Sequence, residues 1–508
     1  MSKLPKKHSE SRYQQYLKAR YRTLLSYTGG VLMLIGGSIL LPLVALLFYP
    51  SELHQAPGFM LAGGAMIGTG YVLWRWRPDK GPPASLTLQE GMVIIVLAWG
   101  ISIVAGAVPF MLAAGLSPTQ AFFESTSAWT STGLTVVNTE EVSRVVLVYR
   151  SITQYVGGAG FAIIVLSAIQ GPTGVGLSTA EGRDEQLAPN VRDSAMLVMR
   201  IYAGYAVLGI VAYLLVGMNA FDAFNHALTA VATGGFSTRN ESIAFYDSAA
   251  IEIVSILLMI LGSINFLAIY LLLRRRVRSF VMNGEIQFFA ALLPLFALVV
   301  FLGTALETYD ALDKQIRVAV FEVASALTTA GFTSTTYVGW TAVGWLALTV
   351  CMIIGGGIGS TAGGIKQFRV LFLLRAVVWE LQRAFLPPHA VNEPHIWRGD
   401  HKIFLTDRRV RLTGVFIFLY LVTWLVGGGI IAAHGHGLER SLFEFSSALG
   451  TAGLTSGITN PEAPASVLWT LNVGMLLGRL EFFAFIIGVL TLGRDLRIIF
   501  FGDMHLNV

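Results

Sequence analysis

One short sequence pattern occurs four times along this chain. Set one above another, the copies read FESTSAWTSTGLT, NHALTAVATGGFS, FEVASALTTAGFT and FEFSSALGTAGLT, and their aligned glycines are Gly133, Gly235, Gly331 and Gly453. In each copy a small or hydroxyl-rich approach precedes the glycine, and Leu or Phe and then Thr or Ser follow it. The glycines lie 102, 96 and 122 residues apart, which is too long for a solenoid repeat and suits hairpin-sized modules. The pattern predicts one pore-loop unit used four times.

The composition places these units in a membrane. Of the 508 residues, 54% are apolar and 13% are charged, and the mean hydropathy is +0.65. Such values are typical of polytopic membrane proteins and exclude an ordinary soluble domain. A helix needs about 20 apolar residues to cross the ~30 Å hydrocarbon core. Ten stretches are long enough: 24–48, 57–75, 89–115, 145–170, 196–217, 248–273, 286–305, 343–375, 411–434 and 465–493.

The ten predicted spans divide into a hairpin and four modules. The first two spans enclose no copy of the pattern, whereas the other eight flank the four glycines in pairs. A segment such as Pro118–Trp129, which lies between a span and its glycine, is too short to cross and predicts a half-membrane pore helix. We therefore expect an all-α polytopic membrane protein in which helix, pore loop and helix recur in a pseudo-fourfold arrangement. Its segments are 1–85 (lead-in and hairpin) and 86–195, 196–283, 284–405 and 406–508 (pore repeats 1 to 4).

Basic residues predict the orientation of the spans. They concentrate in alternate loops, and the opposite loops, YPSELHQAPG and HGHGLER, nearly lack them. Cytoplasmic loops carry such an excess, so we expect both termini in the cytoplasm and all four pore loops to enter from outside. The net charge of +5 is then a topology signal that also attracts lipid headgroups, and no nucleic-acid partner is predicted. The basic residues are Lys3, Lys6, Lys7, Lys18, Arg20, Arg22, Arg75, Arg77, Lys80, Arg183, Arg192, the run Arg274–Arg278, Arg408, Arg409 and Arg411.

Each repeated loop is suited to hold a dehydrated cation. Non-helical backbone at membrane depth is tolerated where it lines a watery cavity, and a ring of carbonyls there replaces the hydration shell of an ion. Glycine lets the chain aim successive carbonyls inward, because it reaches positive φ without a Cβ clash. The loops carry no carboxylate or lysine, which favours a monovalent cation. The predicted filter residues, of which the last two in each set are expected to contact the ion, are Ser131, Thr132 and Gly133; Thr233, Gly234 and Gly235; Thr329, Ala330 and Gly331; and Thr451, Ala452 and Gly453.

A titratable residue stands nine positions before each glycine. It is Glu124, Glu322 and Glu444 in three copies and His226 in the second copy. A carboxylate near the start of a pore helix caps the helix dipole or pairs with a neighbour, and this structural role is favoured. A functional role stays open, but direct contact with the ion is not predicted.

The repeated residues resemble those of the Trk/Ktr/HKT superfamily of potassium transporters. That family has four helix, pore-loop, helix repeats with one filter glycine each, as Gly133, Gly235, Gly331 and Gly453 stand here, and the resemblance runs from about residue 89 to the end. The extra N-terminal hairpin is similar to that of the bacterial Trk-type membrane subunits. A serine in place of the first glycine would instead resemble the sodium-preferring plant branch.

The resemblance implies a function and partners. It implies uptake of potassium, as the substrate ion, across the bacterial inner membrane through one pore in each chain, with no cofactor bound. It also implies a homodimer and a cytosolic ring of nucleotide-binding regulatory subunits docked on the basic loops. The alternative is a secondary transporter that couples potassium to sodium or protons, or that takes up sodium. An intramembrane enzyme is disfavoured, because the sequence has no H-E-x-x-H or G-x-S-x-G motif.

A glycine-rich run, GGGIGSTAGGIK, interrupts the span after the third filter glycine. Such glycine density prevents a continuous helix, and a dinucleotide site is excluded because no strand precedes the run. The resemblance implies that the run forms an intramembrane gating loop beneath the filter; a helix break without a gating role is the alternative. Lys366 either joins the gate or extends to the cytoplasmic face. The predicted gate residues are Gly355, Gly356, Gly357, Gly359, Ser360, Thr361, Gly363, Gly364 and Lys366.

Charged and polar residues also lie within other spans. Arg479 and Glu481 are predicted in the middle of the last span, where a charge is costly unless it faces protein or water. The resemblance implies that Arg479 projects into the pore below the filter as part of the gate; a structural pair with Glu481 or another acid is the alternative. Gln154 and Asn265 are expected to hydrogen-bond between packed helices.

Overall fold

The computed structural model describes residues 6–76, 87–160, 191–385, 387, 394–399 and 401–501. Most of them are helical, and the described residues include one antiparallel ribbon, β1 (His395–Arg398) with β2 (His401–Phe404). The predicted all-α fold class is confirmed. The predicted basic residues Lys3, Arg77, Lys80 and Arg183 and positions 161–170 of the fourth predicted span lie outside the described residues.

The N-terminal hairpin consists of α1 (Lys6–Leu40) and α2 (Ala56–Arg75), joined by the 3-10 turns η1 (Leu41–Leu47) and η2 (Pro50–Gln55). Glycines let the two helices pack closely. A Cβ built on Gly36 would lie 2.7 Å from the carbonyl oxygen of Gly63, and one built on Gly70 would lie 2.7 Å from that of Gly29. Small residues at such contacts hold membrane helices together by van der Waals packing.

Four units follow the hairpin, and each holds a helix, a short pore helix and a second helix. The elements come in the same order in all four units. Unit 1 has α3 (Leu88–Ala113), α4 (Pro118–Trp129) and α5 (Arg144–Gly158); unit 2 has α8 (Val191–Leu215), α9 (Ala220–Val231), α10 (Ala249–Ser263) and α11 (Phe266–Leu273); unit 3 has α13 (Gly284–Val300), α15 (Leu312–Thr328), α16 (Ala342–Ile354) and α17 (Gln367–Ala384); unit 4 has α18 (Asp407–Ala432), α19 (Leu438–Leu449), α20 (Ala465–Leu480) and α21 (Phe482–Phe501). Shorter elements are η3 (Ser242–Tyr246), α12 (Val277–Val281), the π turn η4 (Phe301–Ala305) and α14 (Leu306–Thr308).

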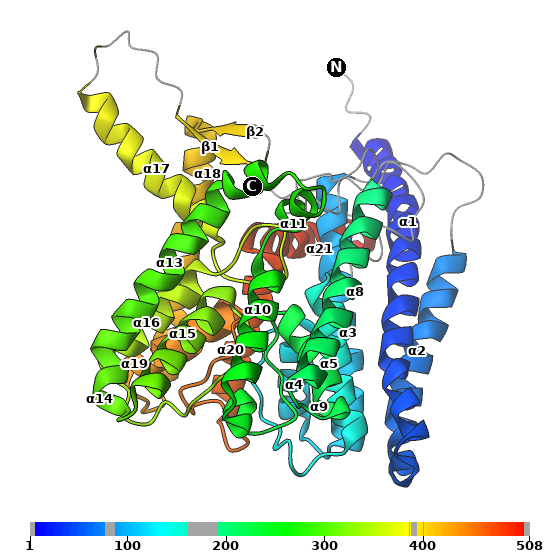
Figure 1. Ribbon diagram of the computed structural model, residues 1–508. Coiled ribbons are helices and arrows are strands. Elements are labelled where there is room, and N and C mark those ends of the chain that lie inside the picture. The colour runs from blue at the N-terminus through cyan, green and yellow to red at the C-terminus, as the bar shows by residue number, and fades with distance from the viewer. Residues whose placement is uncertain are drawn as a thin grey trace.

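The pore helices α4, α9, α15 and α19 lie in the lower half of the molecule, whereas α11, α21 and the β-ribbon lie at its upper end (Figure 1). Local sequence sets where two of them begin. The side chain of Ser117 accepts a hydrogen bond from Gln120 N at the start of α4, and Asn219 accepts one from Asp222 N at the start of α9. These caps satisfy N–H groups that lack a helical partner.

Three predicted spans are not straight helices. The span predicted over 248–273 bends by 105° between α10 and α11, and that over 465–493 bends by 102° between α20 and α21. The span over 343–375 divides into α16 and α17 around the glycine-rich run. Arg479, predicted in the middle of its span, lies in the last turn of α20, beside a break at Glu481, where φ is +59°.

Six of the described helices are long and apolar enough to cross a membrane, and the count rises to eight when each bent pair is taken as one span. The described parts of two further predicted spans are shorter, α5 with 15 residues and α16 with 13.

Candidate functional site

The four repeated loops share one backbone conformation. The residue two positions before each glycine adopts a left-handed conformation, with φ of +50°, +48°, +53° and +48° at Ser131, Thr233, Thr329 and Thr451. The next residue donates its N–H to the carbonyl five positions back, at 2.9, 2.9, 2.9 and 2.8 Å in units 1 to 4. The aligned glycines then have φ of +103°, +72°, +82° and +87°. A non-glycine residue rarely adopts positive φ, so its recurrence at one register marks four copies of the same turn.

The four turns close into a ring. A Cβ built on Gly133 would overlap the carbonyl oxygen of Gly234, and the same relation joins Gly235 to Ala330, Gly331 to Ala452, and Gly453 to Thr132. Each glycine thus lies directly against the carbonyl of the next unit, and the fourth unit meets the first. The structure therefore brings the predicted filter residues of all four units together around one axis.

In three loops, a buried glutamate accepts hydrogen bonds from residues that follow the glycine. Glu322 accepts hydrogen bonds from Ser334 N (2.7 Å) and the hydroxyl of Tyr337 (2.6 Å). Glu444 accepts one from Ser456 N at 2.7 Å and another from Thr455 Oγ1 at 2.8 Å. These carboxylates bond residues that follow the glycine, so they tie the end of each loop back to its own pore helix.

In units 1 and 2, the position nine residues before the glycine holds a glutamate and a histidine, respectively. Glu124 accepts from Thr135 Oγ1 (2.9 Å) and Val136 N (3.1 Å), and His226 Nε2 lies 2.9 Å from Ser237 Oγ. All four side chains at this register are fully buried. Their contacts are with protein groups of the loop, in keeping with a structural role.

Arg150 of α5 joins the loops of units 1 and 2. Its guanidinium pairs with Glu124 at 2.8 Å, donates to Ser237 O at 3.0 Å, and lies 3.9 Å from the centre of the Phe236 ring. Only 1% of the Arg150 side chain is exposed. The sequence does carry a signal for it, since an arginine within an apolar span implies a buried partner, but Arg150 is absent from the predicted site.

We expect Arg150→Met to destabilise the protein by about 3–5 kcal/mol, because it leaves the Glu124 carboxylate charged and buried without its partner. The measurement is the midpoint of thermal unfolding in detergent, followed by size-exclusion chromatography. Arg150→Met combined with Glu124→Gln removes both charges and recovers much of the lost stability. A midpoint for Arg150→Met equal to that of the wild type would contradict the role of this pair.

The glycine-rich run forms an irregular loop against the residues at the inner end of the ring. Gly363 N donates to Thr329 Oγ1 at 2.7 Å, and the hydroxyls of Thr361 and Thr233 lie 3.1 Å apart. A Cβ built on Gly363 would overlap the carbonyl oxygen of Gly450 in unit 4. The loop therefore touches units 2, 3 and 4 directly beside the predicted filter.

Arg479 connects this loop to unit 1. Its guanidinium donates to Thr361 O at 2.8 Å and to the carbonyls of Gly157 and Gly158 at 2.6 and 2.9 Å. Glu481 forms its ion pair with Arg369 of α17 at 2.6 Å, so the predicted alternative of an Arg479–Glu481 pair is not the arrangement found. The arginine holds the glycine-rich loop against the end of α5.

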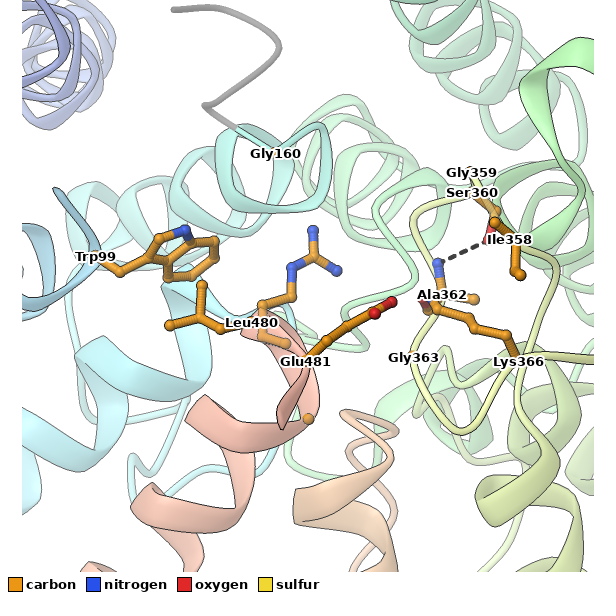
Figure 2. A pocket seen from close by; sticks show the side chains of 12 residues that line it. Trp99, Gly160, Ile358, Gly359, Ser360, Ala362, Gly363, Lys366, Leu480 and Glu481 are labelled. Carbon is orange, nitrogen blue, oxygen red and sulfur yellow. Dashed lines mark hydrogen bonds between the residues drawn. The ribbon is translucent and has the colours of Figure 1, made fainter. Parts of the chain in front are cut away.

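A pocket lies beside the glycine-rich loop. Figure 2 shows Trp99 of α3 and Leu480 and Glu481 of the α20–α21 break on one side, and Ser360 and Gly363 of the loop on the other. Lys366 also lines the pocket, and its ammonium donates to the carbonyl of Ala362 within the loop. Four of the predicted gate residues, Gly359, Ser360, Gly363 and Lys366, thus line one space together with Arg479.

Two polar residues expected between packed helices lie elsewhere. Gln154 contacts the filter region itself: its Nε2 donates to Gly234 O at 2.6 Å and its Oε1 accepts from Phe236 N at 3.1 Å. Asn265 caps α11 at the bend, where its side chain accepts from Leu267 N at 2.7 Å. The helix-packing prediction is therefore wrong for Gln154, because its amide bonds the backbone of a loop.

Comparison with known proteins places this arrangement in a family. A family model described as TrkH, a cation transport protein, matches residues 57–492. The chain is 31% identical over 489 residues to the Trk system potassium uptake protein TrkH of Halomonas elongata, covering 92% of this chain and 98% of that protein. It is also 31% identical over 467 residues to an uncharacterised cation transporter of Methanocaldococcus jannaschii, covering 90% and 93%.

The fold is similar to that of a solved structure as well. The crystal structure of the potassium transporter TrkH from Vibrio parahaemolyticus matches with a TM-score of 0.79 and 28% sequence identity, covering 92% of this chain and 98% of that one.

Proposed function

The chain belongs to the TrkH family of cation transport proteins, and from this membership we propose that it takes up potassium across the bacterial inner membrane. This family consists of transporters, so the chain is not an enzyme. Relatives named as potassium uptake proteins support potassium as the ion. The membrane potential favours inward movement by about 2.3 kcal/mol per charge per 100 mV.

The observation that carries the proposal is the closed ring of four glycine turns. Each turn sets the carbonyl oxygen of Thr132, Gly234, Ala330 or Ala452 against the glycine of another unit. Four carbonyls around one axis supply what a dehydrated monovalent cation needs. We propose that these residues and the adjoining glycines form the selectivity filter, with one pore per chain built from the repeats 86–195, 196–283, 284–405 and 406–508.

The glycine-rich loop serves as the gate in this proposal. It packs at the inner end of the ring through Thr361 and Gly363, and the hydrogen bonds of Arg479 to Thr361 and Gly157 hold it there. A cytosolic ring of nucleotide-binding regulatory subunits would act by shifting this loop. The exposed arginines Arg274 and Arg276, at the end of α11, offer such a partner a basic surface, with both termini on the same cytoplasmic side.

A second copy of the chain is the proposed partner within the membrane. Helix α17 projects from the body of the molecule (Figure 1) and exposes Leu374, Val377, Leu381 and Phe385, the last by 88%. Contiguous apolar surface of this kind is typical of an interaction site. The homodimer would cover it.

The test is the reversal potential of the purified protein in liposomes with potassium and sodium gradients set independently. We expect the reversal potential to follow the potassium gradient alone. A reversal potential that follows the product of potassium and sodium or proton gradients would instead identify a coupled transporter, for which the bent helices α10–α11 and α20–α21 give structural room. Dependence on sodium alone would overturn potassium uptake.

A further inference from the structure

Four glycines mark one equivalent turn in the second helix of each unit. A Cβ built on Gly157, Gly262 or Gly478 would overlap or closely approach the carbonyl oxygen of the last residue of its own pore helix, which is Trp129, Val231 or Leu449. In unit 3 the equivalent glycine by sequence is Gly355 at the end of α16, but a Cβ built there would overlap the carbonyl oxygen of Gly363. The contact with the pore helix aligns the second helices of units 1, 2 and 4 independently of the filter sequence.

The residue one helical turn earlier lies behind the filter. It is Met259, Met352 and Met475 in units 2, 3 and 4, but Gln154 in unit 1, and all four side chains are fully buried. Met259 shares a buried cluster with the filter residue Ala330, and Met352 shares one with Ala452. The second helices of units 1, 2 and 3 therefore back the filter turn of the following unit, and unit 1 does so with an amide.

Gln154 and Gly234 fit each other sterically. A Cβ built on Gly234 would lie 2.5 Å from Gln154 Oε1 and 2.6 Å from its Cδ. The amide of unit 1 thus fills the space that the alanine methyl group occupies in units 3 and 4. The structure contains two kinds of matched pair, glycine with glutamine once and alanine with methionine twice.

The amide also clamps the filter backbone. It donates to Gly234 O at 2.6 Å and accepts from Phe236 N at 3.1 Å, so its two bonds lie on either side of Gly235. A carbonyl oxygen has two acceptor positions, and the second one remains free for an ion. A methionine thioether offers no hydrogen-bond donor, so the three other units have no counterpart to this amide bond at this register.

We propose that Gln154 is a positioning residue for ion discrimination, which holds the Gly234 carbonyl at the distance that suits potassium. A smaller ion such as sodium requires its oxygens to move inward, and a carbonyl tied from behind does not follow it. The inference rests on the proposed potassium filter. In it, the position of the unit 2 carbonyl depends on a side chain of unit 1.

The experiment compares wild type, Q154M, G234A and the double variant Q154M/G234A, each as the purified full chain in liposomes. Under opposed potassium and sodium gradients, the reversal potential gives the permeability ratio. We expect the ratio of Q154M to fall about fivefold, the order of one net hydrogen bond. The control Q287M makes the same change at an exposed position of α13, where the amide donates to Val281 O at 3.1 Å, and its ratio stays at the wild-type value.

The double variant tests the pairing. G234A alone places a methyl group on the amide and lowers potassium flux about tenfold, and adding Q154M recovers most of that flux, because alanine with methionine reproduces the pair of units 3 and 4. Strong coupling between contacting residues is the expected signature. If Q154M is unstable by itself, the double variant still decides the question, since a flux as low as that of G234A rejects the pairing.

The outcomes separate the two proposals. Wild-type liposomes without potassium-selective flux overturn the proposed function, and the inference with it. A selective wild type with an unchanged ratio in Q154M overturns the inference alone.

Discussion

Replacing Gly331 by serine abolishes potassium-limited growth of a strain that lacks its own potassium transport. The added Cβ would overlap the carbonyl oxygen of Ala452 and lie 3.0 Å from the Cα of Gly453, so two units cannot keep their contact. Overpacking costs about 1–3 kcal/mol, which corresponds to roughly a 5- to 150-fold fall in potassium uptake. In Gly133→Ser, the added Cβ would overlap the carbonyl oxygen of Gly234 in the same way. This variant also has a changed preference between potassium and sodium.

Gly100→Ser is the matched control, because it places the same side chain in α3, where a built Cβ has no neighbour within 4 Å. Its growth equals that of the wild type. Uptake of rubidium and sodium by all variants, measured at equal expression, separates a lost pore from an altered one. Growth of Gly331→Ser and Gly133→Ser at low potassium with an unchanged ion preference would show that the filter lies elsewhere.

Arg479→Ala raises potassium flux. The change removes three charge-assisted hydrogen bonds, one to Thr361 O and two to Gly157 O and Gly158 O, that hold the glycine-rich loop against α5. It also removes a positive charge close to the proposed ion path. A loss of only about 1.4 kcal/mol from the closed state raises the open population about tenfold when opening is rare. The measurement is rubidium uptake into liposomes that hold a potassium gradient.

Two variants isolate the cause of the increase. Arg479→Lys keeps the charge but lacks the planar fork that bonds several carbonyls at once, so its flux lies between wild type and Arg479→Ala. Arg497→Ala removes an exposed arginine of α21 and leaves flux unchanged. Equal or lower flux in a well-folded Arg479→Ala variant would reject the arginine as a barrier.

The sequence was informative wherever one unit repeats another. The pore helix over Pro118–Trp129 and the convergence of the four glycines follow from local pattern and register, which every copy repeats. Selectivity by the ring remains a prediction, as does gating by the loop at Thr361 and Gly363.

The sequence was less informative where one unit differs from the others. The bend at Glu481 depends on a single left-handed residue inside an apolar run, and hydropathy does not register it. The contacts of Gln154 and Arg150 join segments about 80 positions or more apart, at Gly234 and Ser237. Neither the repeat spacing nor the composition of the sequence predicts such pairings, because they arise only when the units are packed together.

The contact between Gly453 and Thr132 closes the ring by joining the last unit to the first. A chain emerging from the ribosome inserts units 1 to 3 before unit 4 exists, and until then one side of the oxygen ring faces no partner. The proposed ion path is therefore complete only once unit 4 has packed against unit 1.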